Sequence, residues 1–406
     1  MLYAFILGKN PTLSIAEIVS VLKRDRFVFV ITSISTKTLI IKIDKEIENV
    51  QNFLDKLGGT VKIARVFGTS KESEIAGPMI GYISNSFKGS KFAYGISFYG
   101  IKNKNIGFEI KKYLKTIGIN SRFVLGKEES LSAPEIKNNG IIEKGADFVV
   151  IRNGKDIYVG KTIAIQDYES YSHRDYDRPR RNAKSGMLPP KIAQIMINLI
   201  PLKSNQAKSC KPIIYDPFCG NGTILQEAAL MGFEILGSDL SRDRIYDTQQ
   251  NLCWLKKEYN LDINTKELLF QSDALKLKKE DFPKTPDAIV SEVYLGPPLT
   301  ERVTEKEIFV ITKELEDEYL SFLKNIHLIN ISYLVLALPF YILRKKHYHL
   351  NVIDEAKKIG YNSLSPIQNL DFDLNLLPEY NGKINSIIYS RPEQIVGREI
   401  IVFERK

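Results

Sequence analysis

The stretch Asp216–Thr223, with the sequence DPFCGNGT, contains the strongest chemical signal in this chain. It follows the apolar run Pro212–Tyr215 and precedes a helical pattern, so we expect a loop between a buried strand and a helix. Gly220 and Gly222 would let this loop turn tightly and let its backbone approach a ligand. Asp216, at the end of the strand, would repel a phosphate but suits a ligand with an ammonium group and hydroxyls. The loop therefore favours S-adenosylmethionine over a dinucleotide.

Two further carboxylates are expected at the ends of the next strands. Asp239 follows Glu234–Ser238 about twenty residues later, where an acid can accept hydrogen bonds from ribose hydroxyls. Asp273 ends the third strand, where it can accept from an adenine amino group. Together these acids predict one crevice at a topological switch point, although a turn or a helix cap would explain any single one. The predicted cofactor-binding residues are Asp216, Phe218, Gly220, Gly222, Thr223, Asp239 and Asp273.

The elements expected around these residues alternate between strands and helices. They are the helices Ile192–Leu199, Thr223–Met231 and Arg244–Lys257, and the strands Ile213–Tyr215, Glu234–Ser238, Glu267–Gln271 and Ala288–Ser291. This alternation predicts a doubly wound, Rossmann-like α/β domain, which we assign to residues 191–406. The apolar runs Ser386–Ser390 and Glu399–Phe403 predict an antiparallel terminal hairpin at one edge.

The N-terminal half predicts two smaller α+β domains. Residues 1–67 alternate as strand, helix, strand, strand, helix, strand, which is the order of a ferredoxin-like domain. Residues 68–168 contain an expected strand at Phe92–Phe98, a helix, a short strand and a hairpin whose Asn153-Gly154 turn is typical of type I′. The polar residues 169–190 are expected to form a linker to the catalytic domain.

Composition excludes several classes of protein. The chain has 406 residues, of which 44% are hydrophobic and 26% charged, as in a globular protein of two or three domains. No apolar run reaches the roughly 18 residues that a membrane helix needs. Cys210, Cys219 and Cys253 are too far apart for a CxxC metal site and indicate a reducing, cytoplasmic compartment, so we expect no metal. The net charge of +9 favours a polyanionic partner.

Several motifs resemble one enzyme family. DPFCGNGT is similar to the DPFxGxGT signature of amino-group methyltransferases. Four further stretches resemble THUMP-containing tRNA guanosine N2-methyltransferases: Tyr3–Pro11, Arg174-Asp175 with Arg178-Pro179, Gly186–Ala193, and Tyr389–Gln394 with Gly397–Glu399. The resemblance extends over nearly the whole chain. It implies a ferredoxin-like domain, a THUMP domain that grips tRNA, and a Rossmann-like domain that methylates the N2 amine of guanosine at position 10 of tRNA with S-adenosylmethionine.

The chain departs from this family at the catalytic signature, (Asp/Asn)-Pro-Pro-(Tyr/Phe). The corresponding sequence is Ser291-Glu292-Val293-Tyr294. Counting from Asp287 puts Glu292 at the acid position, whereas alignment on the aromatic residue puts Ser291 there. The extra methylene of Glu292 shifts its oxygen by roughly 1.5 Å, and the loss of both prolines removes local rigidity.

The resemblance implies a role for each of these residues. The acid and a neighbouring carbonyl accept the protons of the amine, and the aromatic ring stacks on the base. The predicted catalytic residues are therefore Glu292, Tyr294 and Ser291. Two alternatives are a non-catalytic tRNA-binding protein with a degenerate site, and an amino-methyltransferase acting on another RNA base.

Arg174, Arg178, Arg180 and Arg181 lie near three tyrosines and are the predicted RNA-binding residues. Guanidinium groups neutralise phosphates, and tyrosines stack on unpaired bases. A solvated linker is the alternative, and Lys102, Lys104, Lys111, Lys112 and Lys115 are explained equally well by a solvated helix face. We expect tRNA as partner and no membrane, and leave open a small partner protein.

Overall fold

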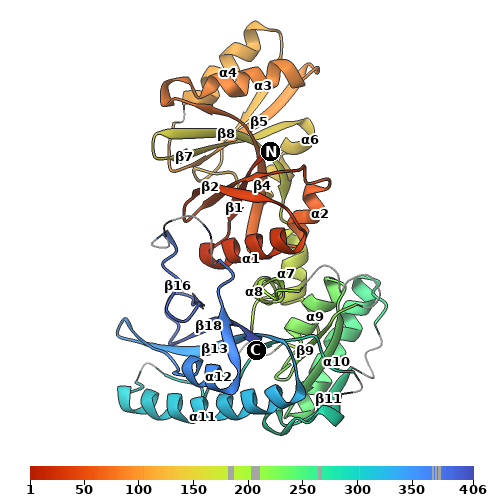
Figure 1. The fold of residues 1–406 in the computed structure, drawn as a ribbon. Helices are drawn as coiled ribbons and strands as arrows, with labels where there is room; N and C mark the ends of the chain where they lie inside the picture. The colour runs from red at the N-terminus through yellow and green to blue at the C-terminus, as the bar shows by residue number, and fades with distance from the viewer. Residues whose placement is uncertain are drawn as a thin grey trace. The chain divides into compact units, whose positions relative to one another are not determined.

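The structure is a computed structural model that describes all residues except 104, 182–186, 203–210, 264–267, 283, 301, 368–369, 371–372 and 374–375. Lys104, Gly186, Cys210 and Glu267, which carried sequence predictions, lie outside the described residues. The described chain forms two compact units (Figure 1). The first comprises Met1–Ile15, Arg26–Tyr168 and Leu370–Leu376, and the second comprises Ala16–Asp25, Glu169–Asn369 and Leu377–Lys406.

The first unit is built on one sheet with the strand order β2-β3-β1-β4-β8-β7-β5-β6. The strands are β1 (Leu2–Leu7), β2 (Phe29–Ile34), β3 (Thr38–Ile43), β4 (Thr60–Ser70), β5 (Lys91–Tyr99), β6 (Asn120–Val124), β7 (Gly145–Asn153) and β8 (Asp156–Ile165). The helices in this part of the chain are α1 (Pro11–Arg24), which belongs to the first unit only as far as Ile15, α2 (Val50–Asp55), α3 (Ala76–Ser86), α4 (Asn105–Thr116), α5 (Ala133–Asn138) and α6 (Ile141–Lys144). The order β1-α1-β2-β3-α2-β4 is the one that the sequence predicts.

The β4 strand continues past residue 67, where the sequence predicts a domain boundary. It pairs with β8 as far as Ser70, with register shifts on the way, so the sheet runs through both predicted N-terminal segments. The β7–β8 hairpin turns at Gly154, whose φ of 59° is the left-handed conformation that the predicted Asn-Gly turn requires.

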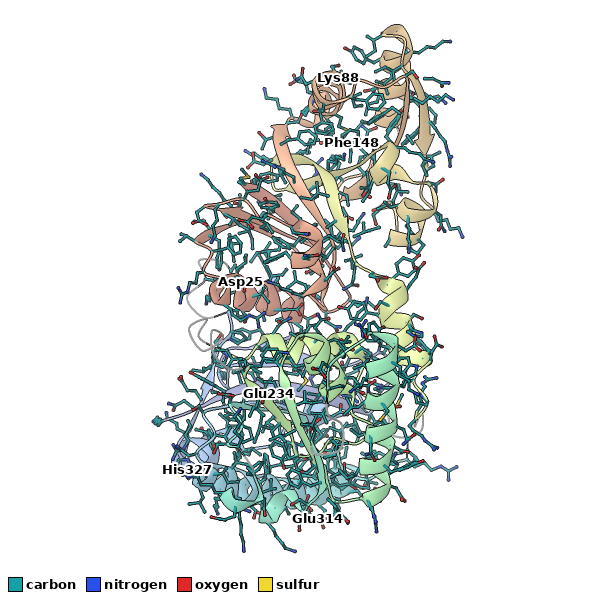
Figure 2. All side chains as sticks on the ribbon, turned by 90° about the vertical axis from the view of Figure 1, so that its right-hand side faces the viewer. Asp25, Lys88, Phe148, Glu234, Glu314 and His327 are labelled. Atoms are coloured by element: carbon teal, nitrogen blue, oxygen red, sulfur yellow. The ribbon has the colours of Figure 1, made fainter. Side chains whose placement is uncertain are left out.

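An ion pair is buried in this sheet. Lys62 Nζ on β4 lies 3.1 Å from Asp147 Oδ2 on β7 and also donates to Ser97 Oγ and to the carbonyl of Leu131. Asp147 accepts from Ser97 at 2.9 Å and from Thr162 at 2.6 Å. The neighbouring Phe148, labelled in Figure 2, is fully buried in the aromatic core of this unit. Each charge of the pair is therefore surrounded by polar partners inside an apolar core.

The second unit contains a sheet with the strand order β11-β10-β9-β12-β13-β18-β17-β16. Its strands are β9 (Ile213–Asp216), β10 (Glu234–Asp239), β11 (Leu269–Gln271), β12 (Ala288–Glu292), β13 (Tyr333–Leu343), β14 (Lys346–Tyr348), β15 (Tyr361–Leu364), β16 (Tyr380–Asn381), β17 (Ser386–Tyr389) and β18 (Val396–Arg405). The strands β9 to β13 pair in parallel, and β18 runs antiparallel between β13 and β17. The predicted doubly wound α/β fold is confirmed.

Helices cover this sheet (Figure 1). They are α7 (Tyr168–Tyr176), α8 (Pro190–Asn198), α9 (Thr223–Leu230), α10 (Arg242–Glu258), α11 (Glu305–Ile329) and α12 (Ile353–Ile359). Glu314 and His327 mark the course of α11 in Figure 2, and its apolar face packs with residues of β12, β13 and β18 in one core. The sequence did not predict α11. The expectation of a linker over 169–190 is corrected in its first part, because α7 is a helix.

Among the described helices, none combines the length and the apolar composition needed to cross a membrane.

Candidate functional site

The candidate site lies where β9 has β10 on one side and β12 on the other. This is the topological switch point of the sheet, at which α/β proteins bind ligands beyond the carboxyl ends of the strands. Asp216 is the last residue of β9, and Glu292 is the last residue of β12. Ser291 Oγ donates a hydrogen bond of 2.6 Å to Asp216 Oδ1 and ties the two strand ends together.

Asp216 is the most deeply buried acid of this site, with 2% of its surface exposed. It also accepts a hydrogen bond of 3.2 Å from the backbone N–H of Phe218. Burial raises its pKa to about 7 against these two hydrogen bonds, and the negative charges of Asp239 and Glu292 add to the rise. A cationic ligand group beside Asp216 would favour the ionised form.

The glycine loop is held in a conformation that only glycine adopts easily. Gly220 and Gly222 have φ values of 52° and 77°. A side chain at position 222 would lie 2.7 Å from Thr248 Cγ2. The Gly220 N–H donates to Asp239 Oδ2 at 3.0 Å, and its carbonyl accepts from Thr248 Oγ1 at 2.7 Å. The loop is thus tied both to the end of β10 and to α10, which confirms the predicted tight turn.

The two remaining predicted cofactor acids, Asp239 and Asp273, differ in the contacts that their carboxylate oxygens make. Asp239 accepts one backbone N–H at each oxygen, from Gly220 and from Ser241, and a carboxylate retains further lone pairs after two such bonds. Asp273 caps the short helix Ala274–Lys276 through the N–H of Leu275, and its other oxygen lies 3.2 Å from Lys276 Nζ. Asp273 therefore has the helix-cap role that the sequence analysis kept as an alternative.

Two predicted RNA-binding arginines are inside the protein, and that prediction is wrong for both. Arg174 is 7% exposed and grips Glu227 of α9, with Nε–Oε1 and Nη2–Oε2 distances of 2.7 and 3.1 Å. Arg178 is 3% exposed and donates to Thr223 Oγ1 at 2.7 Å. Residue 174 lies on the helix α7 and not on a solvated linker, and its guanidinium is buried because it pairs with Glu227. Both side chains bind residues of α9, and because they are buried an RNA phosphate cannot reach them.

Arg180 and Arg181 are exposed, and their RNA contacts stay a prediction. Each guanidinium lies over a tyrosine ring: Arg180 over Tyr246 at 5.3 Å and Arg181 over Tyr176 at 4.9 Å. Asn251 binds the backbone N–H and carbonyl of Arg180, at 2.9 Å each. The segment is thereby fixed at α10.

Glu292 is paired with an arginine that the sequence analysis did not select. Its Oε1 accepts a hydrogen bond from Arg398 Nε, and the two side chains are 20% and 5% exposed. Arg398 belongs to β18 and lies 106 residues further along the chain, so no local spacing could predict the contact. The only signal was the resemblance of Gly397–Glu399 to a family motif.

Ser291 cannot contact a substrate in this structure, and its prediction as a catalytic residue is corrected. Its side chain is fully buried, and its hydroxyl donates a hydrogen bond to Asp216. Of the two alignments considered, the geometry favours the one that places Glu292 at the acid position.

The loop after Glu292 is fixed by tyrosines rather than by prolines. Tyr319 of α11 donates its hydroxyl to the carbonyl of Tyr294, and Tyr341 of β13 donates to the carbonyl of Leu295 at 3.0 Å. The ring of Tyr294 itself is 53% exposed. An aromatic surface is therefore presented next to Glu292 on a backbone whose carbonyls are held.

Two other side chains limit the chemistry. Phe218 directs its ring into the core, where it meets Phe322 of α11 edge to face at 5.5 Å. Cys219 is buried, and burial together with Asp216 and Asp239 raises the pKa of its thiol. A thiol in these surroundings is disfavoured as a nucleophile. In the described part of the chain, no three His, Cys, Asp or Glu side chains gather as metal ligands would.

A hollow of about 500 Å³ lies where this loop leads into the start of α11. It is lined by Pro298, Leu299, Thr300, Arg302, Val303, Lys306, Glu307, Val310 and Ile311. The acids of the strand ends are not part of it, so the hollow is not the cofactor crevice.

The chain is similar to known methyltransferases. Residues 178–281 match the family described as "RMKL-like, methyltransferase domain". A tRNA (guanine(10)-N2)-dimethyltransferase of Pyrococcus abyssi is 29% identical over 219 residues, which are 53% of this chain and 56% of that protein. The enzyme of the same name from Methanothermobacter thermautotrophicus is 33% identical over 129 residues, 31% of this chain and 34% of the relative. The aligned part thus spans at most about half the length of these relatives, and their names agree with the predicted resemblance.

One solved structure resembles the whole fold. The crystal structure of TrmN from Thermus thermophilus aligns with 100% of both chains at a TM-score of 0.52 and 13% identity. At this identity the likeness concerns the fold alone, and it confirms the predicted fold class.

Proposed function

We propose that this protein is a methyltransferase that transfers a methyl group from S-adenosylmethionine to the exocyclic N2 amine of a guanosine in tRNA. The observation that carries the proposal is the meeting of Asp216 and Glu292 at the switch point, next to the glycine loop. In this proposal, Asp216 binds the cofactor and Glu292 binds the substrate. The names of the curated relatives support the same reaction.

The residues of the crevice fit the cofactor. S-adenosylmethionine supplies an electrophilic methyl group on a sulfonium when it is bound. Asp216, buried and of raised pKa, suits the ammonium of the methionine moiety, and Asp239 retains lone pairs for the ribose hydroxyls. Gly220, Gly222 and Thr223 provide the close backbone approach, and Asp273 stands on the adenine side, two residues beyond β11.

Glu292 and Tyr294 act on the substrate base. The lone pair of an exocyclic amine is delocalised into the ring, which makes the nitrogen a poor nucleophile. Glu292 accepts a hydrogen bond from the amine and favours its pyramidal, reactive form, while Tyr294 stacks on the base and fixes its plane. The amine loses one proton on methylation, and Glu292 is the adjacent base.

The N-terminal half grips the RNA in this proposal. Residues 1–67 form the ferredoxin-like part and residues 68–168 the THUMP-like part, with 169–190 leading into the catalytic domain at 191–406. The positive net charge and the exposed Arg180 and Arg181 support tRNA as the partner. We place the protein in the cytoplasm, because a sequence with three cysteines lacks the cysteine pattern of a disulfide framework.

A methyl-transfer assay with labelled cofactor and bulk tRNA, followed by nucleoside analysis, tests the proposal. We expect label in N2-methylated guanosine. The matched control is Asp239→Ala, which should weaken cofactor binding by about 1.5–3 kcal/mol. Label in a methylated adenosine would change the substrate base. Cofactor binding without transfer to any RNA would favour the non-catalytic alternative, and absence of cofactor binding would contradict the proposal.

A further inference from the structure

The carboxylate of Glu292 is held at one oxygen. Arg398 Nε donates to Oε1, and no hydrogen bond to Oε2 from another described residue is found. The side chain of Glu292 remains partly exposed although Arg398 is buried. The carboxylate at the end of β12 is therefore bound at Oε1 and partly exposed.

Arg398 is itself fixed by two neighbouring strands. It lies opposite Pro339 of β13 and opposite Tyr389 of β17 in the register of the sheet. Its guanidinium carbon lies 5.9 Å from the centre of the Tyr389 ring. A planar guanidinium held in this way can order the carboxylate that it binds. Glutamate has one more rotatable bond than the aspartate of the family signature, so this chain has more side-chain freedom to restrain at that position.

The charges around Glu292 explain why a cation is needed. Burial raises the pKa of Glu292, and Arg398 opposes that rise. The other charged group that interacts with it is Asp216 of β9, whose own carboxyl repels a second negative charge. Without Arg398, nothing in the pair would oppose the rise of the Glu292 pKa, and the carboxyl would take up a proton at a higher pH than it does beside the guanidinium. A protonated carboxyl presents a donor where the amine needs an acceptor.

We propose that Arg398 is a positioning residue for methyl transfer: it binds Glu292 at Oε1, maintains the negative charge of the carboxylate, and leaves Oε2 to accept the substrate amine. This inference rests on the proposed function, and it explains how a glutamate can work where related enzymes have a shorter acid. Arg398 does not touch the reacting atoms and acts only through Glu292.

The test compares the pH dependence of kcat in four variants: Arg398→Met, Arg398→Lys, Glu292→Gln and the double variant Glu292→Gln/Arg398→Met. In Arg398→Met the acidic limb of the kcat profile should move up by about 1–3 pH units, the usual effect of removing an adjacent opposite charge. Arg398→Lys should restore most of the profile. In the Glu292→Gln background, Arg398→Met should change kcat by less than about threefold, because no carboxylate remains to be held. An equal loss in both backgrounds would overturn the proposal in favour of a structural role.

Arg391→Met is the matched control, because this arginine of the same hairpin contacts Tyr389 and not Glu292. It should leave the profile unchanged. Cofactor affinity, measured by calorimetry, should be the same in all the Arg398 variants. If Arg398→Met alone fails to fold, the Lys variant and the neutral double variant still decide the question.

A second measurement does not depend on activity. The carboxyl carbon of Glu292, labelled with ¹³C and assigned by its loss in Glu292→Gln, is titrated by NMR in the wild type and in Arg398→Met. An inactive wild type in which this titration depends on Arg398 would contradict the proposed function while supporting the ion-pair inference. An active wild type with the same titration in both proteins would overturn the inference and leave the proposed function intact.

Discussion

Each unit of the molecule buries an ion pair at its sheet, and the two pairs are built differently. In the first unit, Lys62 and Asp147 are both fully buried; Thr162 donates to the Asp147 oxygen that Lys62 binds, and Ser97 donates to the other one. In the second unit, Glu292 is bound by Arg398 at one oxygen, and its side chain is partly exposed at the end of β12.

Under the proposed function, this difference separates a structural pair from a pair that acts on the substrate. Moving charges out of water is costly, and a buried pair is tolerated when every polar atom has a partner. A closed network such as that of Lys62 has no oxygen left for a ligand. In the proposed function, the substrate amine supplies the donor for the open network of Glu292.

The largest effect is expected on stability, from removing one partner of the closed pair Lys62–Asp147. Asp147→Ala should destabilise the protein by about 3–5 kcal/mol, because Lys62 is left buried without its counter-charge. Chemical denaturation measures this loss. The double variant Lys62→Met/Asp147→Leu removes both charges and should recover most of it. A loss below about 1 kcal/mol in the single variant would mean that the two pairs do not differ in the way described.

Substitutions in the open pair, Glu292 and Arg398, should change the turnover number. Glu292→Ala should lower kcat by about 10²–10³, the usual loss for one oriented polar group in a catalytic site. Glu292→Gln should be milder, since its amide oxygen still accepts a hydrogen bond. Tyr294→Phe should be nearly silent, because stacking needs the ring alone. Steady-state kinetics on tRNA measures these effects, and full activity of Glu292→Ala would remove Glu292 from the mechanism.

The third prediction concerns pH at Asp216, the acid next to the open pair. Its pKa of about 7 lies above the ordinary value of 3.8, so the stability that it contributes is present at acid pH and is lost as pH rises through 7. A cofactor ammonium favours the ionised form. Cofactor affinity should therefore fall by up to about tenfold per pH unit below pH 7 and level off above it. Calorimetry from pH 5.5 to 8.5 tests this, and Asp216→Asn should flatten the curve.

The smallest effect is expected at the exposed arginines. Replacing Arg180 and Arg181 by alanine should reduce the slope of log affinity for tRNA against log salt by about 0.7–0.9 for each phosphate that is no longer neutralised. Cofactor affinity should not change. An unchanged slope would mean that these arginines are solvated and that the first unit alone grips the RNA.

Local patterns predicted much of the catalytic unit. The glycine loop, the acids at the strand ends and the parallel sheet all follow from residues that are neighbours in the sequence. The burial of Arg174 did not, because α7 has few apolar residues and its arginine is drawn inward by Glu227, on a helix more than fifty residues away. Charged side chains in a polar stretch are usually solvated, and the prediction for Arg174 followed this rule. A buried charge that is paired with an opposite charge is the exception to it.

The pairing of Glu292 with Arg398 could not be predicted from the sequence, for a different reason. Arg398 meets it only because β18 lies beside β13, and that adjacency is a property of the sheet and not of either segment. Likewise, the tyrosines that fix the loop after Glu292 come from α11 and β13. The sequence shows that the prolines are missing, but it does not show that distant tyrosines hold the loop in their place.

The place of β18 also has a consequence for how the enzyme matures. This strand forms after more than a hundred further residues have followed the glycine loop, yet it lies between β13 and β17 in the finished sheet. Such long-range pairing is slow, because the entropy of closing the chain is lost before the contacts form. A nascent chain can already present the glycine loop and Asp216 while one edge of β13 is unpaired and Glu292 has no arginine. Under the proposed function, the residues that would bind the cofactor are therefore synthesised well before the arginine that pairs with Glu292.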